Sequence, residues 1–288
     1  MHIGAHGDTG GKGYYTTSFC AQSQNLRTRN NYYMKDYGFV VVHVPHASIE
    51  IPEEYKKSIF LSDTQLRREI CRMTDAFCDE LYNAPDFPVQ IVAKYSRFVC
   101  DVERFRDDNL ESQAKLGQGL MYTRTSFGKR LRMHDEALRE KILREVYDPH
   151  HEMLDKAVEN ALNLYGKCLI IDGHSFPSLT RAKPLGIFNR PDFDIGTDSY
   201  HTPDGLRDVL CDKVRELGYS AKVNTPFGGA ITPMKYYRKD KRVASVMIET
   251  NRRLYMNSSN MTKSDDFDET REVCHTLMRC AAEWMINE

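Results

Sequence analysis

The chain has 288 residues, of which 41% are hydrophobic and 28% are charged, and its net charge is −1. This length suffices for a sizeable hydrophobic core. The near-neutral charge excludes the strongly basic surface that is typical of nucleic-acid-binding proteins. No apolar run approaches the roughly 20 residues that span a bilayer, so we expect neither nucleic acid nor a membrane among its partners.

Two features of the sequence concern its location and its N-terminal region. The start of the chain lacks the apolar core of a signal peptide, and its eight cysteines include no Cys-x-x-Cys pair. Both observations favour a reduced, cytoplasmic protein. Residues 1–36 are rich in Gly, Ser, Thr and Asn without a sustained period. We therefore expect a poorly structured arm at 1–36 and a single domain at 37–288.

Hydrophobic periodicity predicts alternating strands and helices along the rest of the chain. Three- and four-residue spacing marks helices, as in Leu66, Ile70 and Met73 after the N-cap residue Ser62. The predicted elements are, in order, a strand at 38–44, a helix at 63–82, strands at 89–93 and 97–102, a long loop at 104–126, helices at 127–146 and 149–165, a strand at 168–172, an irregular segment at 175–203, a helix at 204–217, strands at 219–223 and 243–249, and a helix at 265–286. This alternation predicts an α/β fold with a mixed, mostly parallel sheet flanked by helices.

Three predicted strands end in side chains that a buried strand does not need. His46 comes after the first strand, His174 follows the strand at 168–172, and Glu249 closes the last strand. In open α/β sheets, ligand crevices form at the carboxyl ends of the strands. We therefore expect His46, His174 and Glu249 to share one site.

Imidazole and carboxylate groups in this arrangement are suitable ligands for Zn²⁺. Catalytic zinc sites commonly use three protein ligands and leave one position to water. His46 and His174 are the nitrogen candidates, and Asp172 can orient an imidazole. Asp75 and Asp101 both remain candidates for the third ligand, and Asp75, beside the apolar stripe of the predicted helix, is favoured.

Glu249 has two possible roles beside a metal, as a ligand or as a general base. Two histidines and an aspartate are already available as ligands, so the sequence favours the role of base. A carboxylate there can take a proton from metal-bound water during attack on a carbonyl and pass it to the leaving nitrogen. The competing interpretation is a structural pair between Glu249 and Arg252.

Several arginines lie near the same strand ends. Guanidinium groups bind carboxylates through two parallel hydrogen bonds, so their number favours an acidic substrate. They are Arg97, Arg104, Arg106, Arg252 and Arg253.

Asn224 and the Gly228-Gly229 pair add an amide group and close backbone approach to a ligand. The glycine motifs of nucleotide-binding proteins and the Gly-x-Ser-x-Gly motif of serine hydrolases are absent.

Taken in order, these segments resemble the N-formylglutamate amidohydrolase family over roughly residues 39–256. The individual pieces are short, but the ordered set is specific. The matching pieces are Val44-Pro-His46 with Ile51-Pro52, Thr74-Asp75, Ser96-Arg97-Phe-Val-Cys-Asp101-Val-Glu-Arg104, Asp172-Gly-His174-Ser175-Phe, Asn224-Thr-Pro-Phe-Gly-Gly229 and Ile248-Glu249-Thr-Asn251-Arg252-Arg-Leu-Tyr255.

The resemblance implies a fold similar to the phosphorylase/hydrolase-like sheet of zinc carboxypeptidases. It also implies a zinc-dependent amidohydrolase that cleaves N-formyl-L-glutamate, or a related N-acyl amino acid, with metal-bound water as the nucleophile. Members of the family produce formate and L-glutamate in histidine breakdown. By this resemblance the domain at 37–288 is catalytic, and its metal ligands are His46, Asp75 and His174.

The remaining site residues follow from the same resemblance. Glu249 is the expected general base and acid, and Arg104 is expected to act with it on the substrate. Arg97, Asn224 and Arg252 are expected to bind the substrate. The expected partner is a small acidic N-acyl amino acid, and the expected state is a monomer or a small homo-oligomer.

The sequence departs from the family at two positions and leaves other functions open. Glu103 stands where Asn is common, and an acid there is expected to weaken the hold of Arg104 on a substrate carboxylate. Gly173 stands where Leu is usual. The alternatives are a carboxypeptidase-type metallopeptidase and a non-catalytic binding protein for acidic ligands on the same fold.

Overall fold

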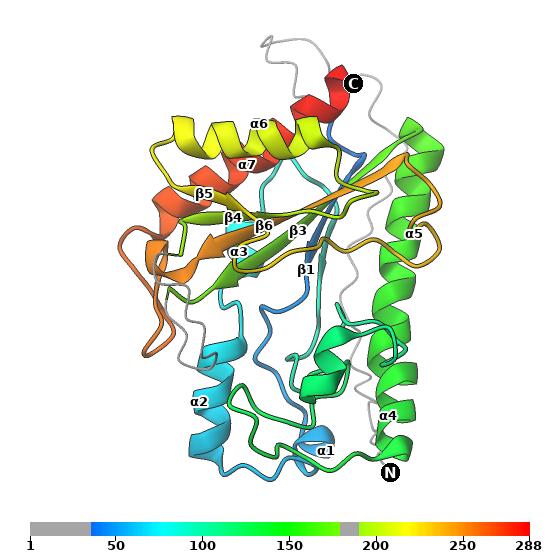
Figure 1. Cartoon of the computed structure of the whole chain (residues 1–288), viewed down its shortest axis with the longest axis vertical. Helices are drawn as coiled ribbons and strands as arrows, with labels where there is room; N and C mark the ends of the chain where they lie inside the picture. Colours follow the sequence, from blue (N-terminus) through cyan, green and yellow to red (C-terminus); the bar gives the residue numbers. More distant parts are fainter. Residues whose placement is uncertain (1–35, 179–189) are drawn as a thin grey trace, which may run out of the picture. The chain divides into compact units, whose positions relative to one another are not determined.

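The computed structural model describes residues 36–178 and 190–288, which belong to one compact unit. Its centre is a six-stranded sheet with the order β2-β1-β3-β6-β4-β5 (Figure 1). The strands are β1 (Val40–Val44), β2 (Gln90–Val92), β3 (Cys168–Phe176), β4 (Phe193–Gly196), β5 (Ala221–Val223) and β6 (Val243–Asn251), with β7 (Met256–Asn257) and β8 (Thr262–Lys263) in a separate pair. The α-helices are α1 (Glu53–Lys56), α2 (Asp63–Met73), α3 (Cys78–Leu81), α4 (Glu136–Ile142), α5 (Asp148–Tyr165), α6 (Asp204–Glu216) and α7 (Phe267–Asn287).

The six-stranded sheet is mixed and mostly parallel, so the predicted fold class is confirmed. Neighbouring strands are parallel except β4, which runs antiparallel to β6. The longest pairing joins β3 and β6, with Cys168 opposite Val243 at one end and Phe176 opposite Asn251 at the other. This pair forms the middle of the sheet.

Alternation along the strands divides their side chains between two cores. Val40 and Val42 of β1 face the core that includes α6 and α7, whereas Val41 packs with Leu154 and Val158 of α5. Successive side chains of a strand point to opposite faces of a sheet. Both faces are therefore covered, one by α5 and the other by α6 and α7 (Figure 1).

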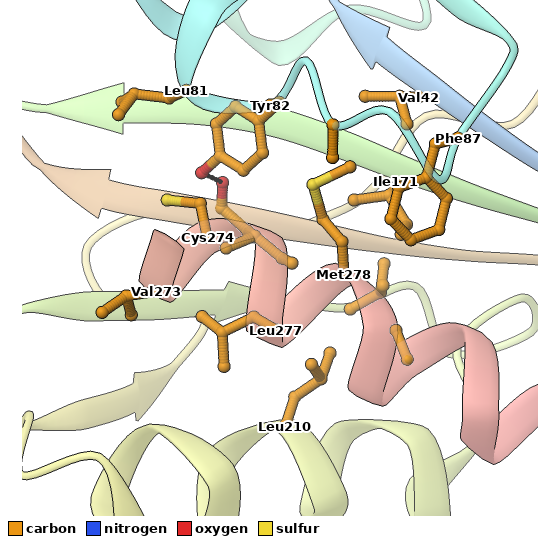
Figure 2. Close-up of a cluster of buried hydrophobic side chains, with 14 of the residues drawn as sticks. Val42, Leu81, Tyr82, Phe87, Ile171, Leu210, Val273, Cys274, Leu277 and Met278 are labelled. Atoms are coloured by element: carbon orange, nitrogen blue, oxygen red, sulfur yellow. Dashed lines mark hydrogen bonds between the residues drawn. The ribbon is translucent and has the colours of Figure 1, made fainter. Parts of the chain in front are cut away.

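The core under α6 and α7 contains closely packed apolar side chains. Figure 2 shows Leu210 of α6 and Leu277 and Met278 of α7 in one cluster of buried side chains with Val42 and Ile171 of the sheet. All five side chains are fully buried. Burying a side chain of this kind contributes about 1.5–3 kcal/mol. A one-residue slip of a strand would move such side chains to the opposite face of the sheet, so this core fixes which residues face each side.

The same alternation directs polar strand residues towards the α5 face. In β3, Asp172 and His174 continue the series of Ile170, which packs in the core with α5. In β6, Glu249 continues the series of Val243, which belongs to that core as well. The packing of the apolar residues thus determines on which side the chemistry lies.

The two central strands are longer than predicted. β3 ends at Phe176 instead of residue 172, and β6 ends at Asn251 instead of residue 249. His174 therefore lies within a paired strand and not after it, and Glu249 lies inside β6 and not at its end. Apolar periodicity ends where the polar residues begin, but backbone pairing continues past that point.

The helix predicted at 63–82 is wrong, because the chain forms α2 and α3 with a break between them. Ser62 caps α2 as expected, in a reciprocal pair with Gln65. The break brings the backbone N–H of Asp75 to the carbonyl of His46 at 2.9 Å, and Phe77 adopts a left-handed φ of 66°. Asp75 therefore lies in a loop and not mid-helix.

Two other segments also differ from their predictions. Residues 97–102 form a turn, in which the N–H groups of Val99 and Cys100 donate to the carbonyl of Ser96. The segment 175–203, predicted to be irregular, contains β4. The turn at 97–102 and strand β4 are short, and tertiary contacts decide their conformation.

The helix predicted at 127–146 begins later than expected. α4 begins at Glu136, where Asp135 accepts a hydrogen bond from the backbone of Leu138. A π-helical turn at Leu143–Tyr147 then joins α4 to α5. The predicted boundary between two helices is thus a continuous helical path.

The prediction of an N-terminal arm at 1–36 lies outside the described residues, except for Asp36. Across 36–178 and 190–288, none of the helices has the length and apolarity needed to cross a membrane. The cysteines within these ranges are free thiols.

Gly173 leaves room for the ring of Tyr82. A Cβ atom at Gly173 would lie 2.5 Å from Cδ2 of Tyr82. The Tyr82 hydroxyl donates to the carbonyl of Ile248 at 2.7 Å and lies 2.8 Å from Oγ1 of Thr250. A buried tyrosine held in this way cannot move aside easily, so a side chain at position 173 would strain the β3–β6 pair.

We predict that Gly173→Ala lowers the free energy of unfolding by about 1–3 kcal/mol, the usual cost of overpacking a core. Urea denaturation measures the change. In a Tyr82→Leu background the cost should shrink, since the ring is gone. An unchanged denaturation midpoint in the single variant would contradict this account of Gly173.

Candidate metal centre and active site

Three residues from separate segments bring potential ligand atoms together. His46 follows β1, Asp75 lies between α2 and α3, and His174 belongs to β3. Nδ1 of His46 is 3.3 Å from Nδ1 of His174. Oδ2 of Asp75 lies 3.2 Å from Nδ1 of His174 and 3.6 Å from Nδ1 of His46. All three side chains are buried, and they form a group that could hold a metal ion.

The spacing and chemistry of this group fit a tetrahedral zinc ion. Ligand atoms that are each 2.0–2.1 Å from such an ion lie about 3.3 Å from one another. The three observed separations are close to that value. Two imidazole nitrogens and a carboxylate oxygen are also a common donor set for zinc. The structure thus brings the three predicted ligands together.

Asp101, the other candidate ligand, contacts the opposite edge of His46. Its Oδ1 lies 2.8 Å from Nε2 of His46, and its Oδ2 accepts hydrogen bonds from Arg97 and Tyr122. Burial raises the pKa of Asp101, but Arg97, His46 and Arg104 lower it well below its usual range. An ionised carboxylate at Nε2 orients an imidazole whose Nδ1 is free to bind a metal.

Asp75 is held in the ionised state by its neighbours. Arg252 donates to its Oδ1 at 2.8 Å. Burial raises the pKa of Asp75, but hydrogen bonds with His174 and His46 and the charge of Arg252 bring it well below its usual range. Arg252 therefore contacts a candidate ligand directly.

Glu103 faces the histidines. Its carboxylate lies 3.1 Å from Nε2 of His174 and 3.7 Å from Nε2 of His46. Burial lowers the pKa of His174, but the charges of Glu103 and Asp172 raise it well above its usual value. The site therefore favours positive charge at His174, which is consistent with a cation between the histidines and Asp75.

A buried chain of polar groups begins at the same Nε2 atom of His174. Oδ1 of Asp172 lies 3.1 Å from Nε2 of His174 and 2.8 Å from Nδ1 of His43. Nε2 of His43 lies 2.9 Å from Nε2 of His150 on α5. Burial, followed by the charge of His43, lowers the pKa of His150 to about 2. His150 is therefore neutral, and one of the two facing nitrogens donates to the other.

Glu249 lies directly opposite His174 in the β3–β6 register. Its side chain is 5% exposed, and its Oε2 is buried without a hydrogen-bond partner in the described part of the chain. Burial raises its pKa to about 8, although His174 opposes the shift. A carboxyl group with a shifted pKa beside a candidate metal site is typical of a proton-transfer group.

The predicted arginines differ in how far they are already engaged. Arg97 donates to Asp101, Tyr122 and the carbonyl of Met73. Arg252 donates to Asp75, Ser175 and the carbonyl of Arg72. Its four hydrogen bonds, two of them to Ser175, span 2.8–3.3 Å.

Arg104 is the least engaged of these three arginines. Its Nε lies 3.4 Å from Asp101 but makes no hydrogen bond within the described residues. Its side chain is partly exposed. Among the predicted substrate arginines, Arg104 has the most capacity left for a ligand.

Asn224 does not join the other predicted site residues. Its side-chain amide contacts Thr197, with Oδ1 accepting from the backbone N–H at 2.9 Å and Nδ2 donating to Oγ1 at 2.8 Å. Because β5 runs parallel to β4, and β4 antiparallel to β6, the end of β5 does not lie beside Glu249. The substrate role of Asn224 stays a prediction.

Asp194 was missed by sequence reasoning. It lies opposite Glu249 on β4 and accepts hydrogen bonds from the N–H groups of Thr225 and Phe227. Burial raises its pKa to about 6. Asp194 thus holds the loop after β5 against the site.

His43 and His150 were also given no role from the sequence. The available signal for His43 was a polar residue inside an otherwise apolar buried strand. His150 lies on a long amphipathic helix and had no such signal. Only the packing of α5 against β1 shows that the two residues meet.

These observations define an α/β domain with a candidate metal site beside a buried carboxyl group on its central strands. The profile of the N-formylglutamate amidohydrolase family matches residues 39–256. The chain therefore belongs to the N-formylglutamate amidohydrolase family.

Individual relatives agree with this assignment. An N-formylglutamate deformylase of Pseudomonas putida is 26% identical over 260 residues, which cover 85% of this chain and 92% of that protein. The crystal structure of an N-formylglutamate amidohydrolase from Ralstonia eutropha superposes with a TM-score of 0.70 at 22% identity, covering 85% of this chain and 93% of that one. A gene product of Agrobacterium tumefaciens gives a TM-score of 0.59 at 18% identity, covering 87% and 92%. The two solved structures show the fold.

We predict that Glu249 makes the metal-free protein less stable as the pH rises. Its pKa is raised from 4.5 to about 8 on folding. The stability that this raised pKa contributes is therefore fully present below pH 4.5, and it is lost as the pH rises towards 8. In chelator-treated protein, the difference in unfolding free energy between Glu249→Gln and wild type should shift in favour of the variant between pH 5 and pH 8.5. A difference that does not change with pH would show that Glu249 ionises normally.

Proposed function

We propose that this protein is a zinc-dependent amidohydrolase that cleaves N-formyl-L-glutamate to formate and L-glutamate. One observation carries the proposal, namely that the His46, Asp75 and His174 ligand atoms converge while Glu249 lies opposite His174. Family membership and the resemblance to a deformylase support the choice of substrate.

The proposed metal ligands are His46, Asp75 and His174. Bound Zn²⁺ supplies a Lewis acid that polarises the formyl carbonyl and lowers the pKa of water to about 7. Asp101 hydrogen-bonds to Nε2 of His46, and Asp172 lies 3.1 Å from Nε2 of His174 as an ion pair, so that the Nδ1 atom of each histidine is left for the metal position. Second contacts of this kind fix the tautomer and orientation of metal-binding histidines.

Glu249 is the proposed general base and then general acid. Its pKa would fall beside a bound cation, since an opposite charge favours the carboxylate. The carboxylate Oε2 then accepts a proton from the attacking water and later donates it to the amide nitrogen, so that the C–N bond breaks and formate leaves. Its burial keeps bulk water from competing for that proton.

Arg104 is proposed to act on the substrate beside Asp101, because its guanidinium retains free hydrogen-bonding capacity. Arg97 and Arg252 are proposed to contribute through the groups they hold, Asp101 and Asp75. Neither the metallopeptidase nor the binding-protein alternative has a specific observation in its favour.

We also propose that the enzyme acts in the cytoplasm, in histidine catabolism, as a monomer or a small homo-oligomer. The free thiols of the described cysteines support a reducing compartment. The proposed partner is a small molecule, and the proposed metal is the only cofactor.

We expect Glu249→Gln to lower kcat for N-formyl-L-glutamate by about 10²–10⁴-fold, the usual contribution of general acid–base catalysis. Substrate binding should persist, because the amide keeps the size of the side chain. Formate release and calorimetric binding measure the two effects. Glu216→Gln, on the exposed face of α6, is the matched control, and equal activity of the two variants would exclude Glu249 as the base.

We expect Asp172→Asn to lower the zinc affinity by about 10–100-fold, as is common for groups that orient a ligand. Competition with a coloured chelator measures the affinity without reference to turnover. Asp212→Asn, at an exposed position of α6, should leave the affinity unchanged. If Asp172→Asn binds zinc as wild type does, Asp172 does not position His174.

A further inference from the structure

Arg190 is an arginine near the site with no role so far. It precedes β4, whose first residues pair with the end of β6. Its guanidinium carbon lies 5.8 Å from the ring centres of both Phe176 and Phe227. Its Nη1 donates to the carbonyl of Pro177 at 2.8 Å. Two aromatic rings and one carbonyl thus fix the plane of the guanidinium.

The polar groups of Arg190 are incompletely satisfied. Its Nε is buried and makes no hydrogen bond within 36–178 and 190–288, where Arg190 also forms no ion pair. Nearby Arg252 and Arg253, by contrast, are paired with Asp75 and Asp192. A buried donor on a cation is costly unless it meets an acceptor. The missing acceptor is most simply an anionic ligand.

Glu249 is a second unsatisfied group in the same neighbourhood. Its Oε2 is likewise buried without a partner among the described residues. Burial lowers the pKa of Arg190, and Glu249 is the charge that most strongly opposes this shift. Arg190 packs on Phe176, which follows His174 by two residues on β3, and Glu249 lies opposite His174 on β6. Both groups therefore lie at the same end of the β3–β6 pair, and no hydrogen bond joins them among the described residues. A ligand between them would contact both.

The order of the strands places Arg190 and Arg104 on opposite sides of the candidate active centre. Arg104 contacts Asp101, which holds His46 after β1. Arg190 precedes β4, beyond β3 and β6 in the sheet. A ligand at His174 and Glu249 would thus have one guanidinium on each side. N-formylglutamate, which has two carboxylates, matches this arrangement.

We propose that Arg190 binds the side-chain carboxylate of the substrate and makes the enzyme selective for a dicarboxylic substrate, an inference that rests on the proposed function. Phe227, which is 38% exposed, offers apolar surface for the methylene groups of that side chain. Phe176 is fully buried and holds the guanidinium from behind. Asp194 accepts from the N–H of Phe227 and so fixes the loop that carries this ring.

The test compares N-formyl-L-glutamate with N-formyl-L-glutamine, whose side chain has nearly the same shape without the charge. A hydrogen bond to a charged group contributes about 10–100-fold in binding. Arg190→Gln should therefore lower the ratio of kcat/KM for the glutamate over the glutamine substrate by about that factor. The turnover of N-formyl-L-glutamine should change little. Arg190→Lys should retain part of the selectivity.

Arg242→Gln is the matched control, because Arg242 is exposed and paired with Asp240. Its substrate ratio should equal that of wild type, and thermal denaturation should show that all variants are folded. Equal losses on both substrates in Arg190→Gln would overturn the proposal, since Arg190 would then serve a group that the two share. An unchanged ratio would overturn it as well.

A binding measurement separates this proposal from the proposed function. If wild type hydrolyses no N-formyl amino acid, the proposed function fails, and glutarate binding to the zinc-loaded chain becomes the readout. Binding that weakens at least tenfold in Arg190→Gln but not in Arg242→Gln would still support Arg190 as a carboxylate site. Equal glutarate affinity in wild type and Arg190→Gln would refute it.

Discussion

The register between β3 and β6 is the constraint on which the site depends. Apolar side chains packed under α6 and α7 determine which residues of both strands face each side of the sheet. The parallel pairing then sets His174 opposite Glu249. One set of contacts therefore positions a candidate ligand and a proton-transfer group together. Tyr82 reinforces this pair, since its ring occupies the space above Gly173 and its hydroxyl reaches the carbonyl of Ile248.

The charges around this pair are balanced by direct contacts. Asp101 neutralises Arg97 and holds His46, and Asp75 neutralises Arg252 while facing both histidines. Buried charges are tolerated when they are paired and hydrogen-bonded. Within 36–178 and 190–288, Oε2 of Glu249 has no such partner, and burial raises its pKa. Asp101 and Asp75 are thus ionised and bonded to neighbouring groups, whereas Glu249 has a raised pKa and is the candidate for proton transfer.

The fold class and the meeting of His46, His174 and Glu249 could be predicted from the sequence, because apolar periodicity and strand-end residues carry both signals. Asp75 was favoured as a ligand from a position in a helix that does not form, and its place in the ligand set came from the family resemblance. The break between α2 and α3 could not be predicted, since it depends on the bond from Asp75 to the His46 carbonyl. Asn224 was expected to act with the other site residues, but its side chain bonds to Thr197, and β4 separates β5 from β6. Contacts between distant segments carry no local sequence pattern.

The central claim is that the converging ligands hold a metal ion that hydrolysis requires. The most direct measurement is formate release from N-formyl-L-glutamate by chelator-treated protein as zinc is returned in known amounts. The account predicts that activity rises in proportion to zinc and levels off at about one ion per chain, the number that one three-ligand site holds. Full activity in the folded, metal-free protein would contradict it.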